Sequence, residues 1–517
     1  AMRTALGLSR RSFLRDELRQ KQARDTDTDT VQQTVKRTHY LRGAPVRDAR
    51  KEAENAALGG MRSPIVAVNR LQSHTTGASI RHAIEEYLMT HRGYMKQTLA
   101  AIGKPKGTFD AENVHLDAIR GRMATILGAH SIDPVRNGWI TTPLRADLLM
   151  AWAARTKDPA VKIIPWLWEG APAGITRHIE DSGIFPTKED EATCDIDELL
   201  ACQEYDGNYM SLTDDPEAEQ LIQKMVDPTR GWVRTFTDEK EMIQFLGGPP
   251  VVSPLGLVVK TKTDLQGAET TKKRIILDAK RSRANECATA PWRILLPRPF
   301  HAVDDALKLM RAARSANSRR SIDMERIRVE HLLADYEDAF WAIPLFPTER
   351  RFQVCKWGDT WIVLLRTGQG TKTGGLTWGL ISATAGRFGQ SLFQAWEVLI
   401  QIYTDDPLSA VSGTNEERDL RMATIMVLWS ALGLGVAFHK ASRGFDTVWI
   451  GARFKLFEDK VVVSINPELL RDLLALIKKL LSKPIAPVKL VRRMAGQSNH
   501  IAGLVFAWRP FISDLWG

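Results

Sequence analysis

Two adjacent carboxylates, Asp405 and Asp406, are the strongest candidates in the sequence for residues of a functional site. The apolar run 398–402 leads into Tyr403, and Pro407 follows the pair, which predicts a strand, a tight turn and a return strand. Neighbouring carboxylates at a strand end repel each other and lose hydration, and a bound cation offsets both costs. The pair therefore indicates a divalent metal site, although an acidic residue before proline is also an ordinary turn former.

A third acid, Asp335, follows a second strand-like run, residues 326–334. Each of the two predicted strands therefore carries an acid at its carboxyl end. Asp338 comes three residues after Asp335 and is predicted to cap a short helix. Between the two strands, the segment 376–383 follows two glycines and runs into a predicted helix. Along the chain, the order is therefore the segment after Asp335, the glycine-preceded segment 376–383 and the turn with Asp405 and Asp406.

In that order, the three segments resemble the palm motifs of reverse transcriptases. The segment Asp335–Leu345 resembles the first motif and Thr377–Phe388 resembles the second. The Tyr-x-Asp-Asp box Tyr403–Asp406 is the signature of the family. The resemblance extends over residues 250–510 and implies an α+β right-hand polymerase. Such a fold has fingers, a palm with an antiparallel sheet and a thumb, and here a mostly helical N-terminal extension precedes it.

The same resemblance implies a retroelement-type enzyme that carries out RNA-directed DNA synthesis. Asp335, Asp405 and Asp406 would hold two Mg²⁺ ions, with Mn²⁺ as the alternative metal. The implied partners are an RNA or DNA template with its primer and deoxynucleoside triphosphates, and the oligomeric state stays open. A non-catalytic nucleic-acid-binding scaffold on a polymerase fold is the alternative. Such a scaffold would be expected to lose the acids first, and all three are present.

Nucleotide-binding residues are also implied in the fingers. Two predicted strands, 255–259 and 274–278, form a basic hairpin joined by a polar loop. Lys260 and Arg274 match the positions that hold the incoming triphosphate, with Lys262 as a competitor for Lys260. Arginine donates to phosphate in pairs and lysine acts as a point charge. An exposed basic hairpin without this role is the alternative.

In the palm, the resemblance places Phe340 beside the nucleotide sugar and Lys440 near the leaving pyrophosphate. Trp378 and Gly379 would lie against the template or nucleotide, the glycine because it permits close approach to the backbone. Trp378 stands where the family often has Gln or Phe, which puts the shape of the pocket in doubt. A core aromatic and a surface lysine are the alternative interpretations of Phe340 and Lys440.

Downstream segments resemble the primer grip and the thumb. Trp449, Ile450 and Gly451 match the primer-grip hairpin. The pair Asn466-Pro467 predicts the start of a helix. The leucine-rich stretch 469–481 that follows is amphipathic, as expected of a thumb helix.

Composition agrees with a nucleic-acid partner. The chain has 517 residues, a formal net charge of +10 and a sequence pI near 9.4, which is consistent with a polyanionic ligand. Its four cysteines form no C-x-x-C pair, which argues against a zinc module and favours a reducing, intracellular compartment, nuclear or cytoplasmic. No run of 18 apolar residues is present, so no membrane partner is expected.

The chain is predicted to comprise five segments. They are a basic, disordered tail (1–60), a mostly helical extension (61–217), fingers (218–325), a palm (326–460) and a thumb (461–517). The extension ends in an acidic stretch, residues 187–217, that is predicted to be a solvated linker because clustered acids repel a polyanion.

Overall fold

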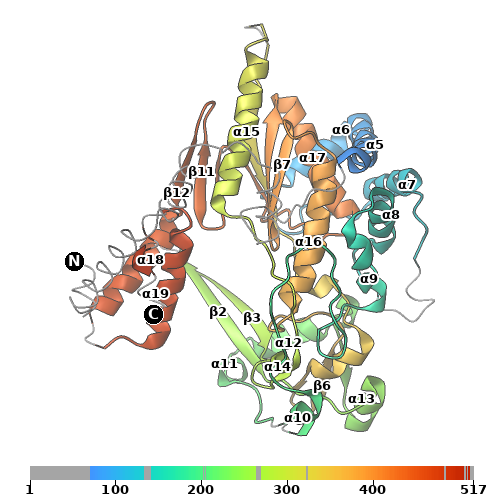
Figure 1. Ribbon diagram of the computed structural model, residues 1–517, viewed down its shortest axis with the longest axis vertical. Helices are drawn as coiled ribbons and strands as arrows, with labels where there is room; N and C mark the ends of the chain where they lie inside the picture. The colour runs from blue at the N-terminus through green and yellow to red at the C-terminus, as the bar shows by residue number, and fades with distance from the viewer. Residues whose placement is uncertain are drawn as a thin grey trace, which may run out of the picture. The chain divides into compact units, whose positions relative to one another are not determined.

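The computed structural model describes residues 70–132, 141–201, 203, 205–263, 269–321, 324–482, 485–505, 508 and 510–512 (Figure 1). The predicted tail, residues 1–60, lies outside them. The chain divides into two compact units, one of residues 62–464 and one that contains residues 465–517. The fold is α+β, and the pairs β1–β6, β5–β6, β2–β3, β4–β8, β4–β9, β7–β8 and β10–β11 are antiparallel.

A four-stranded sheet lies at the centre of the larger unit. Its strand order is β7-β8-β4-β9, with bounds Val398–Tyr403 (β7), Asp406–Gly413 (β8), Arg328–Leu333 (β4) and Ser442–Gly444 (β9). The two strands predicted before the acids are thereby confirmed. Five of the six β4 residues are buried, because helices cover both faces of the sheet. They include Glu330, whose charge is paired with Arg418 at 2.8 Å.

Helix α15 (Pro299–Asn317) covers one face of this sheet, through Ala306, Leu309 and Met310 packed on Val329 and Ala410. It does so although it precedes residue 326, where the palm segment was predicted to start. Helices α16 (Gly374–Ser391) and α17 (Asn415–Ala431) cover the other face. Helix α16 was predicted, and Thr414 with Glu417 forms a capping box at the start of α17.

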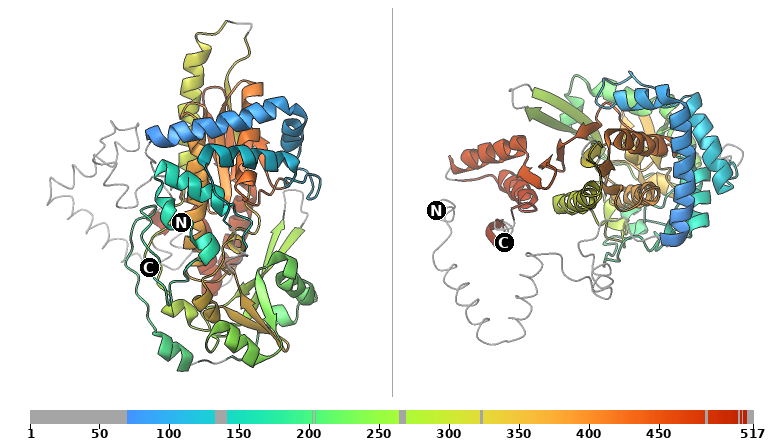
Figure 2. Two further views of the ribbon diagram at one scale, coloured as in Figure 1. Left: turned by 90° about the vertical axis from the view of Figure 1, so that its right-hand side faces the viewer. Right: turned by 90° about the horizontal axis from the view of Figure 1, so that it is seen from above.

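The N-terminal extension packs on α16 and α17 as an outer layer. Its main helices are α5 (Arg70–Thr90), α6 (Arg92–Ala100), α7 (Val114–Leu127) and α8 (Ala146–Thr156). Helices α5, α6 and α7 contact α17, and α8 packs on α5 and α7; Figure 2 shows this layer in blue to teal. Because α16 and α17 lie between this layer and the sheet, both are buried on nearly all sides. The ring of Trp152 stacks on that of Phe388 with centroids 4.6 Å apart.

Buried polar contacts join the extension to the same layer. Arg387 of α16 donates to Asp158 at 2.7 and 2.8 Å, and the two side chains are 1% and 0% exposed. Arg81 of α5 pairs with Glu397 just before β7 at 2.5 Å. A buried charge is stable only when it is paired, so these contacts fix the extension to the sheet layers. The extension is therefore an integral part of this unit.

The predicted basic hairpin is present, with longer strands than the sequence indicated. Strand β2 (Leu255–Thr263) pairs with β3 (Glu269–Leu277) from Leu255↔Leu277 to Thr263↔Glu269. Much of the predicted polar loop is therefore strand. Its β-branched threonines fit a pleated strand better than a loop, and strand pairing overrides the polar composition.

A second small sheet combines residues from two parts of the chain. Its strand order is β1-β6-β5, with bounds Val233–Phe236 (β1), Thr360–Leu364 (β6) and Val354–Trp357 (β5). Helices α11 (Met210–Thr213) and α12 (Ala218–Val226) pack with it and with the basic hairpin around Leu212, Ile222, Leu257 and Ile362. The shorter remaining elements are η1 (Pro159–Lys162), α9 (Trp166–Glu169), α10 (Ile196–Ala201), η2 (Pro228–Arg230), α13 (Glu239–Leu246), α14 (Ala284–Cys287), η3 (Ala339–Ala342) and η4 (Pro347–Phe352).

The acidic stretch 187–217 is not a solvated linker, and this prediction was wrong. Three of its carboxylates pair with basic residues of the hairpin and the segment after it, and Cys194, Leu199 and Leu212 are buried. The pairs are Glu198–Arg283 (2.8 Å), Asp206–Arg281 (2.9 Å) and Asp215–Lys273 (2.8 Å). Clustered acids repel one another only while they lack counter-charges, and the basic partners come from distant sequence.

The C-terminal segments form a hairpin and a helix pair. Strands β10 (Asp446–Trp449), β11 (Ala452–Leu456) and β12 (Val461–Ile465) form a three-stranded sheet. Helices α18 (Pro467–Leu481) and α19 (Val488–Ile501) pack through Leu473, Leu476, Leu480 and Met494. Asn466 accepts from the backbone N–H of Glu468, which confirms the predicted start of α18. Among the described residues, no helix combines the length and the apolar character needed to span a bilayer.

Candidate metal and nucleotide site

The turn that carries the paired acids is a tight hairpin between β7 and β8. Tyr403 pairs with Asp406, which leaves Thr404 and Asp405 as the two turn residues. Thr404 has a φ of 59°, in the left-handed region, as such a hairpin requires. The predicted strand, turn and return strand are thus confirmed, and Asp405 lies at the tip.

Three hydrogen bonds hold the backbone of this turn. The indole N–H of Trp378 donates to the Thr404 carbonyl at 2.9 Å, and that of Trp449 donates to the Asp406 carbonyl at 3.0 Å. The backbone N–H of Tyr336 donates to the Asp405 carbonyl at 2.8 Å. Each of the three consecutive carbonyls therefore has a donor from a different element, and the position of the acids is fixed by α16, by the chain after β4 and by β10.

Asp335 lies directly beside this turn. The backbone N–H of Ala334 donates to the Pro407 carbonyl at 3.0 Å, and Tyr336 donates to Asp405 as described. The backbone carbonyl of Asp335 accepts from the N–H of Ala437 at 2.9 Å. The structure thus brings the three predicted acids onto adjacent backbone segments, although 69 residues separate Asp335 from Asp405 in the sequence.

The electrostatics of the acids reflect this proximity. Burial, followed by the neighbouring charge of Asp335, raises the pKa of Asp405, while its own backbone N–H, Arg274 and Lys440 act in the opposite direction. An upward pKa shift means that the folded protein disfavours the ionised form. Added positive charge at this point, from a metal ion or a cationic side chain, would offset that cost.

Lys440 supplies positive charge to Asp335 in this structure. Its ammonium group lies 2.5 Å from Asp335 Oδ2. Over the part of the chain that the structure describes, no three acidic, histidine or cysteine side chains converge into a group that could hold a metal ion. The donor set itself suits Mg²⁺, which prefers carboxylate oxygens, so the metal assignment of Asp335, Asp405 and Asp406 stays a prediction that requires their side chains to turn together.

The strand register identifies a basic residue that the sequence prediction missed. Arg274 lies opposite Val258, and Lys272 lies opposite Lys260. Partial burial, then the charges of Arg274 and Lys440, lowers the pKa of Lys272, while Asp335 and Asp405 oppose the shift. Lys272 therefore belongs to the charge cluster around the acids. Alternation along a strand, two positions from Arg274, could have indicated it if the polar loop had been recognised as strand.

Lys260 lies farther from the base of the hairpin than Arg274 does, and it is exposed. Its cross-strand partner is Lys272, and both side chains share the face of Arg274, because cross-strand partners and alternate residues point the same way. The role predicted for Lys260 stays a prediction, and the charge interactions of Lys272 with Asp335 and Asp405 make Lys272 a second candidate for it. The competing residue Lys262 lies two pairs closer to the hairpin end, opposite Thr270.

Two predicted nucleotide contacts are corrected by burial. Trp378 is 1% exposed and uses its indole to support the turn. Gly379 is buried in α16, where a side-chain carbon would meet Ile294 and Phe185 at ordinary contact distances. Both residues are enclosed by other parts of the chain, because α16 lies between the sheet and the extension.

Phe340 lies in η3, partly buried beside the first turn of α16. A carbon added at Gly374 would lie 3.6 Å from Phe340 Cδ1, and the Thr367 hydroxyl donates to the Phe340 carbonyl at 2.7 Å. Asp338 precedes η3 in a left-handed conformation (φ 53°) and makes no capping bond, so the predicted cap was wrong. Arg230 instead reaches its carboxylate at 3.4 Å.

The hairpin predicted as a primer grip is present between β10 and β11. Ile450 and Gly451 form its turn with φ values of 40° and 76°. Trp449 is 3% exposed and anchors the Asp406 backbone. The hairpin is present as predicted, and its contact with a primer stays a prediction.

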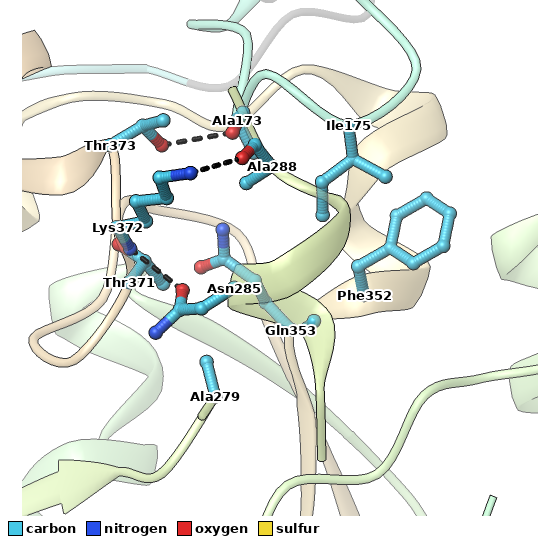
Figure 3. A pocket seen from close by; sticks show the side chains of 11 residues that line it. Ala173, Ile175, Ala279, Asn285, Ala288, Phe352, Gln353, Thr371, Lys372 and Thr373 are labelled. Atoms are coloured by element: carbon cyan, nitrogen blue, oxygen red, sulfur yellow. Dashed lines mark hydrogen bonds between the residues drawn. The ribbon is translucent and has the colours of Figure 1, made fainter. Parts of the chain in front are cut away.

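A small cavity lies between α14, η4 and the segment before α16, and Figure 3 shows its lining. Lys372 Nζ donates to the Ala288 carbonyl at 2.7 Å, and Thr373 Oγ1 donates to the Ala173 carbonyl at 3.0 Å. Its volume of about 10 Å³ accommodates about one water molecule. A nucleotide cannot bind there, and the cluster of acids and basic residues remains the candidate site.

No protein-family model and no curated protein matches this chain. Among solved structures, it is similar to the foamy viral protease-reverse transcriptase in complex with an RNA/DNA hybrid, at 12% identity and a TM-score of 0.38, over 60% of this chain and 35% of that chain. A second foamy viral structure, in complex with double-stranded DNA, gives 15% identity and a TM-score of 0.37 over 58% and 43%. The chain thus spans less than half the length of these proteins, and the similarity is too low to assign a family.

Proposed function

We propose that this protein is a template-dependent nucleic-acid polymerase of the reverse transcriptase type, which extends a primer with deoxynucleotides on an RNA template. The observation that carries the proposal is the junction of β4 with the β7–β8 turn. There the 2.8 Å bond from Tyr336 N to Asp405 O joins the backbones of the two acid-bearing segments. Lys272, Arg274 and Lys440 add positive charge at the same place.

The division of work among the side chains follows from their chemistry. Asp335, Asp405 and Asp406 would hold two Mg²⁺ ions, which when bound supply the positive charge that activates a 3′-hydroxyl and stabilises a leaving pyrophosphate. Arg274 and Lys272 would bind the triphosphate through charge-assisted hydrogen bonds. Lys440 would leave Asp335 and turn towards the phosphates. Fixed carboxylates and cations suit phosphoryl transfer, because its catalysis rests on positioning and electrostatic stabilisation.

Primer extension with the purified protein on matched RNA and DNA templates tests the proposal directly. Extension on RNA that depends on Mg²⁺ or Mn²⁺ would support it. The ion pair of Lys440 with Asp335 is also what a non-catalytic nucleic-acid-binding scaffold would show, because a lysine then replaces the metal charge. Binding of primer–template without extension on either template would favour that second function.

Replacement of Lys272 by methionine is expected to lower kcat/KM for the incoming nucleotide by about ten- to a hundred-fold, since a hydrogen bond to a charged group contributes about 1.5–3 kcal/mol. Lys260→Met is the matched control, because it removes the same charge from the directly opposite strand position. We expect less than about a threefold change for it, as for a surface residue. Steady-state extension rates at varied nucleotide concentration measure both. A larger effect of Lys260→Met would instead assign the triphosphate contact to Lys260, as predicted from the sequence.

Replacement of Phe340 by alanine is expected to raise ribonucleotide incorporation relative to deoxynucleotide incorporation. In the proposed function a bulky ring beside the sugar excludes a 2′-hydroxyl sterically, which is a clash built against the wrong substrate. Phe340→Tyr keeps the bulk and serves as the control. Competition between the two nucleotide types in single-turnover assays gives the ratio. Lower stability and activity with an unchanged ratio would instead identify Phe340 as a core residue.

A further inference from the structure

A cluster of exposed arginines lies at the carboxyl end of α15 and the start of β4. Two hydrogen bonds hold these two ends together, from Asn317 Nδ2 to the Ile327 carbonyl and from Ile327 N to Asn317 Oδ1, both 2.9 Å. We call the cluster the arginine surface. Its members are Arg311, Arg314, Arg319, Arg326 and Arg328.

A groove runs along the arginine surface. Its volume is about 270 Å³, and its lining includes Arg314, Arg326 and Arg328 together with Phe457 from the loop after β11. The Phe457 ring is 46% exposed. Glu458 and Asp459 also line it. An exposed aromatic ring among arginines is the composition of surfaces that bind nucleic acid, where bases stack and guanidinium groups contact phosphates.

The five arginines of the arginine surface are not neutralised by ion pairs in the part of the chain that the structure describes. Within the described residues, none of its five arginines forms an ion pair with a carboxylate, whereas Arg387, Arg418 and Arg443 are each paired. The carboxyl end of a helix carries only about half a negative charge, which one cation offsets. The planar, permanently charged guanidinium group binds phosphate in a paired geometry.

The arginine surface is remote from the acids. Arg328 is the first residue of β4 and Asp335 follows the end of the same strand, so about 20 Å separate them at a rise of about 3.3 Å per residue. Figure 1 shows the carboxyl end of α15 at the top of the larger unit, away from the β2–β3 hairpin at its base. At 3.4 Å per base pair, this distance corresponds to about six base pairs of duplex.

We infer that the arginine surface is a second nucleic-acid contact of this protein, which binds the phosphodiester backbone about six base pairs from the acids. The inference rests on the proposed function, in which a nucleic acid occupies the site at the acids. It adds a contact that holds the same molecule by its backbone without reading its sequence. The expected contribution is to affinity and not to the rate of nucleotide addition, because no member of the arginine surface lies near the acids.

The test is a triple variant, Arg314→Glu, Arg326→Glu and Arg328→Glu, with the wild-type chain and a matched control. The control is Arg92→Glu, Lys96→Glu and Lys104→Glu, which changes the net charge equally at exposed residues of the extension. Fluorescence anisotropy at several salt concentrations measures binding of an RNA/DNA duplex of about 12 base pairs, twice the estimated distance, and of single-stranded RNA. The two ligands distinguish whether the duplex or a single strand is bound.

We expect the arginine variant to bind at least about tenfold more weakly than the control, with the slope of log affinity against log salt smaller by about two to three. Its kcat at saturating primer–template is expected to equal that of the wild type. Arg328 also lies 4.1 Å over the Phe445 ring, so a glutamate at this position could disturb the fold. A second triple variant, with glutamine at the same three positions, removes the positive charges without adding negative ones. Thermal melting checks the fold of each variant.

Equal weakening in the arginine and control variants, or no weakening in either the glutamate or the glutamine set, would overturn the inference. If the wild type extends primers and the arginine variants bind normally, the inference fails while the proposed function stands. If the wild type binds nucleic acid through the arginine surface but extends no primer, the surface is supported and the proposed catalytic function fails.

Discussion

Replacement of Asp405 by asparagine is expected to slow primer extension by at least about a thousand-fold, equivalent to about 4 kcal/mol of activation free energy. The substitution removes a negative charge at the tip of the β7–β8 turn and leaves the backbone that Tyr336 contacts unchanged. Template binding should stay close to the wild-type level, because basic residues provide it. Single-turnover extension and an anisotropy titration with primer–template measure the two quantities separately.

The stability of this variant separates lost chemistry from lost fold. Since burial and Asp335 raise the pKa of Asp405, the folded protein binds this proton more tightly than the unfolded chain. At pH 7 the ionised side chain therefore costs the folded state stability, and stability rises as the pH falls through the raised pKa. Asparagine lacks that cost, so the Tm at pH 7 should equal or exceed that of the wild type. Extension at the wild-type rate would remove the metal assignment, and a lower Tm would indicate damage to the turn.

Replacement of Arg387 by methionine is expected to destabilise the larger unit by about 3–5 kcal/mol. The variant leaves the carboxylate of Asp158 without its partner at a position that is 0% exposed, and a buried charge without a partner is the costliest arrangement. The Asp158 side chain also accepts from the N–H of Ala160 at 2.8 Å. This hydrogen bond can remain if the carboxyl group becomes protonated in the variant. Urea-induced loss of secondary structure measures the effect.

Two further variants serve as controls for this prediction. Arg453→Met breaks an exposed pair with Asp446, whose side chains are 35% and 43% exposed, and should cost less than about 1 kcal/mol. The double variant Asp158→Asn with Arg387→Met removes both charges and should recover part of the loss. If Arg387→Met costs no more than the exposed control, the ion pair does not hold the extension on α16.

The parts of the site that could be predicted are those whose signals are local. Asp405 and Asp406 follow an apolar run and precede a proline, which together determine a strand and its turn. Asn466-Pro467 determines a helix start in the same way, because a cap and a first-turn proline act within one turn of helix. Strand and helix formation at these positions depends on neighbours only a few residues away.

The parts that could not be predicted depend on partners distant in the sequence. The acidic stretch 187–217 has the composition of a linker, and basic partners distant in the sequence, among them Lys273, Arg281 and Arg283, pair with its acids. Lys272 lies in a segment that is polar enough to predict a loop, and its alignment with Arg274 appears only once β3 pairs with β2. Pairing between strands sets the register, and composition alone cannot supply it.

Trp378 shows the opposite error, in which a motif position suggested a ligand contact. Its indole donates to the Thr404 carbonyl, so the residue acts on the acids through their backbone. A tryptophan N–H that is buried needs an acceptor, and the Thr404 carbonyl in the turn supplies it. No sequence pattern distinguishes an indole that supports a turn from one that faces a nucleotide.

The contacts between the extension and the sheet layers also affect how this protein is synthesised. Asp158 leaves the ribosome 229 residues before Arg387, and Arg81 leaves it 316 residues before Glu397. At about 5–20 residues per second, the helices of the extension wait roughly 10–60 s for the surfaces on which they pack. During that interval these helices can pack on one another, but the faces that contact α16 and α17, such as Trp152 against Phe388, lack their partners. Productive expression should therefore depend on slow aggregation or on a chaperone that shields the extension until translation reaches α17.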